Sequence, residues 1–270
     1  MGKKKEIARK EVDCIVKKYN IRIAGSYSIK NGLVDIDGDF YLTHSSLRKL
    51  PLRFGKVSGD FICSSNRLQT LSGAPFYVAG NFNCYGNQLK SLKYAPLEVG
   101  GDFSSHENEL TSLLGSPKCL NGSFNVFLNQ LENLNGGPEK VAGSYYAFKN
   151  RLTTLSGAPS YIGRSFHISG NKLKNLIGCP EYIGDILSFD DGIGSLFMGS
   201  QNCEVNKIVI ETQEKKHNSN RIVSAILKSN LPALPILFKY MNYTDIFSPD
   251  GTFNRQNFED MIFEIDNGLR

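Results

Sequence analysis

The sequence of 270 residues has no long hydrophobic run. No apolar stretch approaches the roughly 18 residues that a membrane-spanning helix needs. The basic start, MGKKKEIARKEVDC, is not followed by the apolar stretch of a secretory signal, and Glu6 stands where a myristoylation site requires Ser or Thr. We therefore expect an unprocessed protein with no membrane partner.

The six cysteines lack the paired spacing of a metal site or a disulfide framework. No CxxC motif occurs, and no histidine stands at metal-ligand distance from a cysteine in the sequence. Isolated cysteines of this kind are typical of reduced thiols in a cytosol, where they behave as small apolar residues. The sequence therefore predicts a cytoplasmic location, with no metal and no cofactor.

Motifs of the common enzyme classes are also missing. The sequence contains no Walker loop, no GxSxG nucleophile motif and no HExxH zinc motif. A calcium loop with Gly251 at its sixth position would start at Ile246 and end at Asn257, where acidic ligands are needed. We therefore predict no catalytic residue and no enzymatic activity.

A basic stripe of the kind that binds nucleic acids is missing too. The net charge of +5 comes mostly from residues 1–20, which contain seven Lys or Arg and three Asp or Glu. Residues 36–198 are nearly balanced, with 14 basic and 13 acidic residues. This distribution disfavours a nucleic-acid partner. Binding to nucleic acid or to a membrane surface through the basic start stays as an alternative.

What the sequence does contain is an internal repeat with the template V-x-G-[DNS]-F-x-C-x-x-N-x-L-x-x-L-x-G-A-P-x-x. A shortened copy of 13 residues, IAGSYSIKNGLVD, precedes the first full block, and an eighth copy starts at Ile183 and decays by about Leu196. A fixed period of this length predicts a solenoid. Seven consecutive blocks of 21 residues, named repeats one to seven, start at Ile36, Val57, Val78, Val99, Leu120, Val141 and Ile162.

This template resembles the leucine-rich repeat, whose signature is L-x-x-L-x-L-x-x-N-x-L. The likeness covers about 160 of the 270 residues, and the short period is similar to the compact repeats of bacterial and bacteriophage proteins. It implies an α+β fold, a leucine-rich-repeat solenoid with stacked short parallel strands on its concave face. Bacterial effectors with similar repeats carry a ubiquitin-ligase domain with a Cys-x-Asp motif. In this sequence Cys203 is followed by Glu204 and Val205 instead.

Several template positions have a physical reason. Position 5 is Phe or Tyr and positions 12 and 15 are Leu in all seven repeats, so stacked repeats would form one apolar column. Position 10 is Asn in repeats two to seven, and an inward amide can donate hydrogen bonds to carbonyls of neighbouring turns. Repeat one has Ser45 at this position. Glycine at position 3, replaced by Arg164 in repeat seven, is expected to allow tight corners.

If positions 3–8 form a short strand, positions 5 and 7 point inward and positions 4, 6 and 8 point outward. Position 8 then carries a row of four rings from Tyr85 to Phe148, with Tyr146 beside them. An exposed aromatic patch marks a partner site, whereas rings that only stabilise the strand ladder are the alternative interpretation. The predicted partner-binding residues are Tyr41, Ile62, Asn83, Tyr85, His106, Asn125, Phe127, Tyr146, Phe148 and His167.

The sequence predicts three parts: a basic helical cap over 1–22, the solenoid over 23–198, and a helical cap or domain over 199–270. Within the solenoid, the seven full repeats cover 36–182, and partial copies lie at both ends. A first helix is expected from about Lys3 to Lys18. The C-terminal part is expected to hold about four short helices: Val205 to Lys216, Asn220 to Lys228, one started by Pro232 and Pro235, and one capped by Asn254.

These features together favour a non-catalytic module that binds another protein through the concave face. The likeness to phage-type repeats suggests a viral or bacterial protein that engages and inhibits a host or competitor factor, in the host cytoplasm if viral. In an alternative interpretation the repeats are a targeting arm for an effector in the C-terminal helical segment. Self-association through the open ends or the aromatic patch stays as a further alternative.

Overall fold

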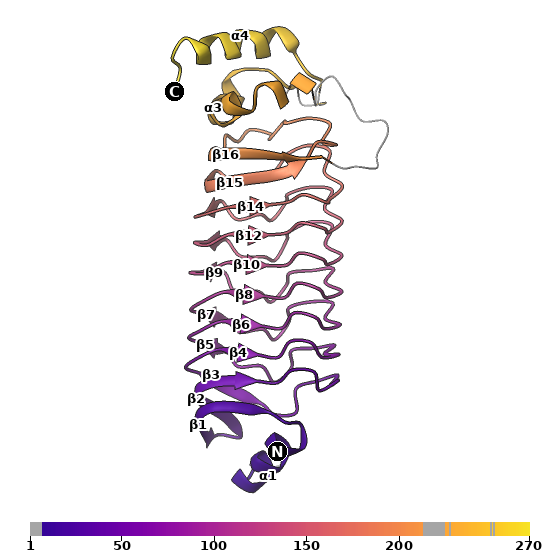
Figure 1. The fold of residues 1–270 in the computed structure, drawn as a ribbon, viewed down its shortest axis with the longest axis vertical. Helices are drawn as coiled ribbons and strands as arrows, with labels where there is room; N and C mark the ends of the chain where they lie inside the picture. Colours follow the sequence, from indigo (N-terminus) through magenta and orange to yellow (C-terminus); the bar gives the residue numbers. More distant parts are fainter. Residues whose placement is uncertain (1–6, 213–224, 227, 249, 251) are drawn as a thin grey trace. The chain divides into compact units, whose positions relative to one another are not determined.

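The computed structural model of the chain describes residues 7–212, 225–226, 228–248, 250 and 252–270. These residues form a parallel β-solenoid of about eight turns with few helices (Figure 1). The chain divides into two compact units. Unit 1 contains Met1–Gln130 and Gly136–Pro138, and unit 2 contains Leu131–Asn135 and Glu139–Arg270.

In unit 1, successive repeats contribute short strands that pair in parallel at the 21-residue period, so that Phe61 pairs with Phe82 and Phe82 with Phe103. One ladder begins with β2 (Leu33–Tyr41) and continues through β4 (Phe61–Ile62), β6 (Phe82–Asn83), β8 (Phe103–Ser104) and β10 (Phe124–Asn125). The other strands are β3 (Phe54–Val57), β5 (Tyr77–Val78), β7 (Glu98–Val99) and β9 (Cys119–Leu120). Of these, β3 pairs with β2 and β5, and β5 pairs with β7.

Unit 2 follows the same plan. Its short strands are β11 (Lys140–Val141), β12 (Tyr145–Tyr146), β13 (Tyr161–Ile162) and β14 (Phe166–His167). The longer strand β15 (Tyr182–Asp190) pairs in parallel with both β13 and β14, so one continuous strand joins the two ladders. The predicted eighth copy therefore continues the strand pairing of the repeats.

The strands differ from the predicted span of positions 3–8. Only positions 5 and 6 are paired in the first ladder, and a second strand at positions 21 and 1 was not predicted. Position 9 has a left-handed backbone in every repeat, which turns the chain out of the extended conformation just after position 8. The residues at this position are His44, Ser65, Gly86, Glu107, Leu128, Lys149 and Gly170.

The core follows the predicted apolar column. The position-5 rings are fully buried, and in unit 1 they contact each other from repeat to repeat, with ring centroids 4.6 Å apart for Phe40 and Phe61 and 5.7 Å apart for Phe61 and Phe82. In unit 2 the centroids of Tyr145 and Phe166 lie 5.3 Å apart. Burying one large ring in every turn stabilises a stack whose single repeats have no core of their own.

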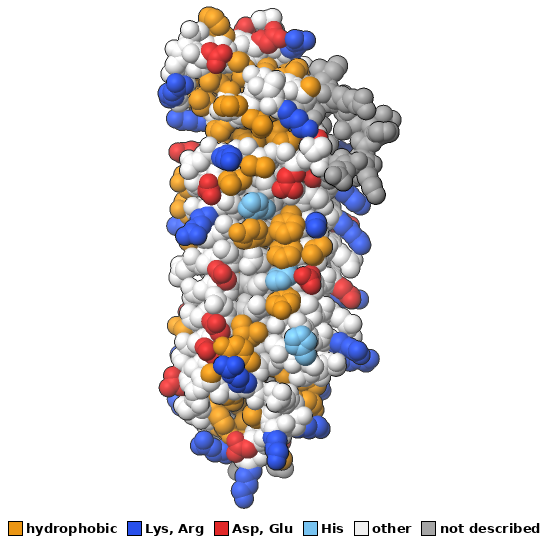
Figure 2. All heavy atoms as spheres, viewed as in Figure 1, with side chains coloured by type: hydrophobic (Ala, Val, Ile, Leu, Met, Phe, Trp, Pro, Cys, Tyr) orange, Lys and Arg blue, Asp and Glu red, His pale blue; other side chains and the backbone are white. Residues whose placement is uncertain are grey.

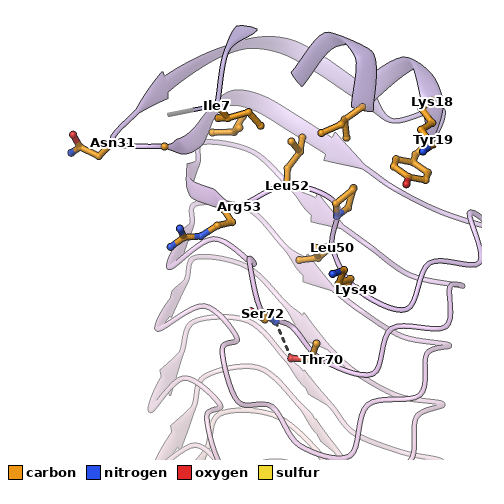
Figure 3. A pocket seen from close by; sticks show the side chains of 14 residues that line it. Ile7, Lys18, Tyr19, Asn31, Lys49, Leu50, Leu52, Arg53, Thr70 and Ser72 are labelled. Carbon is orange, nitrogen blue, oxygen red and sulfur yellow. Dashed lines mark hydrogen bonds between the residues drawn. The ribbon is translucent and has the colours of Figure 1, made fainter. Parts of the chain in front are cut away.

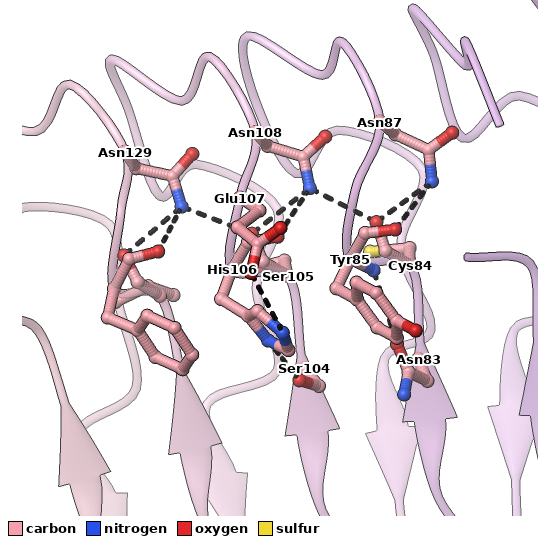
Figure 4. A network of polar contacts seen from close by, with 12 residues as sticks. Asn83, Cys84, Tyr85, Asn87, Ser104, Ser105, His106, Glu107, Asn108 and Asn129 are labelled. Atoms are coloured by element: carbon pink, nitrogen blue, oxygen red, sulfur yellow. Dashed lines mark hydrogen bonds and ion pairs between the residues drawn. The ribbon is translucent and has the colours of Figure 1, made fainter. Parts of the chain in front are cut away.

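The position-10 asparagines form a hydrogen-bonded ladder, as predicted, in which all but the half-buried Asn66 are buried (Figure 4). The side-chain amide of Asn108 donates to the carbonyls of Cys84, Ser105 and His106 at 3.1, 3.1 and 3.2 Å. Its side-chain oxygen accepts from the backbone N–H of Leu89 at 3.0 Å. Each amide thus satisfies backbone groups that have left the strand ladder. In unit 1, the residues named the asparagine ladder are Asn66, Asn87, Asn108 and Asn129.

Glycine at position 3 has a different reason from the tight corner that was predicted. A side chain at Gly80 would place its Cβ 2.3 Å from Oδ1 of Asp60, and one at Gly122 would place it 2.4 Å from Oδ1 of Asp102. The position-4 side chain of the preceding repeat fills that space, because it accepts a hydrogen bond from the next backbone N–H, as from Asn81 to Asp60 at 2.7 Å. Position 3 is glycine so that the backbone can approach this side chain closely.

The shortened first copy is not a solenoid turn, contrary to prediction. Its residues lie mostly in β1 (Arg22–Lys30), which pairs antiparallel with β2 along its full length. The turn between them is Asn31–Gly32, and both residues have positive φ, 54° and 73°. Asn-Gly between two extended runs is the preferred sequence for such a hairpin.

The helix α1 (Arg9–Lys18) begins later than predicted. Of the predicted range, residues 3–6 lie outside the described residues, and Ile7 and Ala8 are not helical. The carbonyl of Ala8 accepts from the backbone N–H groups of Glu11 and Val12, which starts the helix. Val12 is the fully buried residue of α1.

The segment after the repeats was predicted to begin with a helix from Val205 to Lys216, but residues 204–211 form the strand β16 (Glu204–Glu211). This strand pairs in parallel with β15. Its sequence, EVNKIVIE, is rich in β-branched residues, whose stiff side chains favour an extended backbone. The predicted helix from Asn220 to Lys228 falls mostly outside the described residues.

The last helices agree better with prediction. The 3₁₀ helix η1 (Leu231–Ala233) and helix α3 (Leu234–Tyr240) each carry a proline near the start, and η2 (Met241–Tyr243) follows. Helix α4 (Arg255–Asp266) begins after Asn254, whose side chain accepts from the N–H of Asn257 at 3.2 Å. Among the described residues, no helix has the length and apolar character to span a membrane.

Candidate functional site

In each unit, the predicted site residues lie on the outward side of the strands that carry position 5, here named the strand face of that unit. It comprises positions 6 and 8 of the repeats, and all ten predicted residues are half-buried. Figure 2 shows hydrophobic and histidine side chains grouped on this face. Unit 1 holds Tyr41, Ile62, Asn83, Tyr85, His106, Asn125 and Phe127, and unit 2 holds Tyr146, Phe148 and His167.

Three rings of unit 1 form a continuous stack. The ring centroids of Tyr85 and His106 lie 4.6 Å apart with an interplanar angle of 7°, and those of His106 and Phe127 lie 4.3 Å apart at 13°. These residues, named the ring stack, follow the ends of β6, β8 and β10, and Figure 4 shows Tyr85 and His106. Because the faces of His106 are covered on both sides, the stack presents mainly ring edges to solvent.

Local hydrogen bonds orient the ring stack. Nδ1 of His106 lies 2.8 Å from Oγ of Ser104, and the backbone N–H of Tyr85 donates to Oδ1 of Asn83 at 3.2 Å. Burial lowers the pKa of His106, whereas the carboxylate of Glu107, 4.0 Å from Nε2, opposes this shift more weakly. His106 is therefore a neutral ring at neutral pH, which suits stacking between two other rings.

A shorter stack occurs in unit 2. The ring centroids of Tyr146 and His167 lie 5.0 Å apart at an interplanar angle of 2°. Nδ1 of His167 lies 2.9 Å from Oγ of Ser188, and burial lowers the pKa of this histidine as well, with Glu211 and Asp185 acting weakly in the opposite direction. Phe148 is half-buried on the same face of unit 2.

Tyr41 is held by contacts within the chain rather than left open. The guanidinium of Arg22, at the start of β1, lies 4.7 Å from the ring centroid of Tyr41. The hydroxyl of Tyr41 donates to the carboxylate of Asp39 at 3.1 Å. The hairpin thus covers the N-terminal end of the strand face. The candidate binding surface is therefore limited to the middle repeats.

The acidic residues beside the rings have a structural role. Asp39 and Asp60 each accept a hydrogen bond from the position-4 backbone N–H of the following repeat, at 2.9 and 2.7 Å. Asp102 accepts in the same way from Ser123 at 2.7 Å. One oxygen of each carboxylate is therefore committed to the contact between successive turns.

Sequence reasoning missed a group of exposed apolar residues away from the strand face. Phe76, Tyr94 and Leu97 are 46%, 55% and 72% exposed, in repeats two and three of unit 1. The N–H of Leu97 donates to the carbonyl of Phe76 at 3.0 Å, so these two lie in adjacent turns. The sequence contained a signal for this group. Repeats two and four to seven have Gly at position 17, whereas repeat three has Tyr94, whose φ is left-handed at 72°.

Within the described part of the chain, no group of three or more His, Cys, Asp or Glu side chains could hold a metal ion. No protein-family profile, curated protein or solved structure matches the chain. The function must therefore be argued from the surfaces of the protein itself.

Proposed function

We propose that the chain is a non-catalytic protein-binding module that uses the strand face. The observation that carries this proposal is the ring stack, in which Tyr85, His106 and Phe127 remain half-exposed in the middle of a regular solenoid. Aromatic residues dominate the binding energy of protein interfaces when they are desolvated by a partner. A rigid strand face also loses little conformational entropy on binding.

The geometry of the stack favours a protein over a nucleic acid or a sugar as the partner. Nucleobases bind to protein aromatics by stacking on an open ring face. In the ring stack, the rings of Tyr85 and Phe127 cover both faces of His106, so this ring offers only its edge. Ring edges and a neutral imidazole remain for contact, and these suit apolar side chains and backbone carbonyls of a protein surface.

We further propose that the repeats are of the leucine-rich-repeat type and that the terminal helices act as caps. The supporting features are the buried position-10 asparagines and the paired leucines at positions 12 and 15. At the N-terminal end, Oγ of Ser45 in repeat one donates to the carbonyl of Tyr19, the residue after α1. Ser45 thus connects the first full repeat to the helix that precedes it.

Affinity capture from host or bacterial lysates, followed by mass spectrometry, tests the binding proposal. The wild-type chain is compared with a Tyr85→Ala/Phe127→Ala variant and with a matched Phe76→Ala/Leu97→Ala variant. The control removes two exposed apolar side chains from unit 1 but leaves the strand face intact. Thermal unfolding of all three proteins checks that they remain folded.

We expect a captured protein to be lost from the Tyr85→Ala/Phe127→Ala variant and retained by the control. Purified, that protein should bind the strand-face variant at least about tenfold more weakly than the wild type, as for an interface hot spot. Equal capture by the wild type and the strand-face variant would reject the strand face as the binding site. Loss from the control alone would assign binding to the surface of Phe76 and Leu97.

A further inference from the structure

A hollow lies in unit 1, between α1 and the outer segment of repeat one (Figure 3). It has a volume of about 1040 Å³ and is open to solvent on one side. Apolar side chains of Ile7, Ile15, Leu50 and Leu52 line it. Repeats two and four to seven have Gly at position 17 and repeat three has Tyr94, whereas repeat one has Leu52, so Leu at this position is specific to the first repeat.

The charged residues that line the hollow are all basic. They are Lys18, Lys49 and Arg53, each exposed, and no Asp or Glu is among the lining residues. On α1, Asp13 does not line the hollow and accepts from the hydroxyl of Tyr27. Asp35 accepts from the backbone N–H of Lys56 and lies 4.0 Å from Nζ of Lys30. An anionic ligand would therefore meet three cations and no lining carboxylate.

The spacing of the cations indicates an elongated ligand. Lys49 and Arg53 stand at the two ends of the segment Lys-Leu-Pro-Leu-Arg, and Leu50 and Leu52 between them are buried in the floor of the hollow. Figure 3 shows Lys49 and Arg53 on opposite sides of the two leucines. A segment of this length separates its end residues by at most about 13 Å, so an extended peptide with acidic residues up to four positions apart can reach both cations.

Polar groups in the hollow favour a peptide over a lipid. Asn31, Thr70 and Ser72 line it together with the apolar side chains. An amide and two hydroxyls can bond to peptide N–H and C=O groups. A fatty acid has a single charged end, so it would leave the second cation and these polar groups without a partner.

We propose that this hollow binds an extended peptide of a partner protein that has apolar residues between two acidic ones. The chain's own start, MGKKKE, has three lysines and one glutamate, so its charge does not match the basic lining. This site does not depend on the strand face, and it would give the protein a second contact with the same or another partner.

The test is a fluorescence-polarisation titration of the full chain with a labelled peptide, Glu-Leu-Gly-Leu-Glu, at low salt. A second peptide with Gln in place of both Glu measures the contribution of charge. The site variant is Lys49→Glu/Arg53→Glu. The matched control, Lys90→Glu/Arg151→Glu, changes two exposed cations elsewhere and lowers the net charge by the same amount.

We expect the acidic peptide to bind the wild type and the control alike, and to bind the site variant about tenfold more weakly. Added salt should weaken this binding, and the glutamine peptide should bind poorly at any salt concentration. If the site variant and the control lost the same affinity for the acidic peptide, net charge alone would explain the loss and the proposal would be overturned. So would failure of the acidic peptide to bind the wild type.

Two further outcomes would replace the peptide with another occupant. Displacement of the bound peptide by dodecanoate at stoichiometric concentration would assign the hollow to a lipid-type carboxylate. Sedimentation showing that the wild type dimerises, and the Lys49→Glu/Arg53→Glu variant does not, would assign it to a second copy of the chain.

Discussion

Unit 1 carries two rows of side chains, which lie only two positions apart in each repeat. Their burial is the reverse of what the polarity of the side chains would predict. The asparagine ladder at position 10 is polar and buried, whereas the ring stack at position 8 is apolar and half-exposed. Each buried amide makes bonds that the backbone requires, as Asn108 does to three carbonyls and one N–H. The exposed rings satisfy no such requirement.

This comparison separates residues that specify the fold from residues that are free to serve a partner. A buried polar row persists because leaving turn carbonyls and N–H groups unbonded costs more than burying an amide. A half-exposed apolar row gains little from the fold, because its rings still contact water on their edges. The predictions below break or sharpen this distinction, from the largest expected effect to the smallest.

Replacing Asn108 with Leu should give the largest loss of stability in these two rows. The substitution keeps the side-chain size but leaves the N–H of Leu89 without its acceptor, and it removes one donor from each of three carbonyls that keep another, which should lower the free energy of unfolding by about 2–3 kcal/mol. Urea denaturation measures this loss. The matched substitution Asn125→Leu on the strand face should cost less than about 1 kcal/mol. Similar losses for both variants would contradict the distinction between the two rows.

Replacing Phe127 with Ala should have an intermediate effect on folding. It removes the contact with His106 and part of the apolar surface, so a loss of about 1–2 kcal/mol is expected. The same substitution at Phe124, which is fully buried at position 5, should cost about 3–5 kcal/mol. If Phe127→Ala destabilised the protein as much as Phe124→Ala, the ring stack would be part of the core and the proposed binding role would lose its basis.

Ser105 tests whether a buried polar group helps only when it is bonded. Its Oγ is buried and has no hydrogen-bond partner among the described residues, at position 7 where other repeats have Leu, Cys, Val, Ala or Ile. Ser105→Ala should therefore raise the free energy of unfolding by about 1 kcal/mol. Ser104→Ala, which removes the bond to His106, should lower it slightly. A loss of stability in Ser105→Ala would refute this view.

The smallest effect concerns pH. Burial lowers the pKa of both His106 and His167, so the unfolded chain binds protons at a higher pH than the folded one. Their contribution to stability is complete above the unfolded pKa of about 6.5 and is lost as the pH falls from that value through the lowered pKa of the folded chain. The midpoint temperature of thermal unfolding should therefore be lower at pH 5.5 than at pH 7.5. This decrease should be smaller for His106→Phe. The same pH dependence in both proteins would exclude His106 as a source.

Much of the candidate site could be predicted because side-chain direction follows from the repeat. Position 5 identifies the inward face through its unbroken series of rings, and positions 6 and 8 then share the opposite face. The degree of exposure could not be predicted in this way. Tyr41 obeys the same pattern as Tyr85, yet Arg22 from the hairpin covers its ring. That contact depends on β1, which lies outside the periodic part of the sequence.

The sequence by itself determined the 21-residue period, the buried rings, the asparagine ladder and the parallel stacking of the repeats. The sequence could do so because each turn of a solenoid packs against neighbours with the same pattern. The period therefore predicts which residues contact one another. The tertiary structure alone decided the ends, where β1 turns back as a hairpin and β16 pairs with β15. It also gave the reason for glycine at Gly80 and Gly122, because a side chain of the preceding turn fills the space that a Cβ would take. The two ends depend on contacts between unlike segments, and no periodic pattern encodes them.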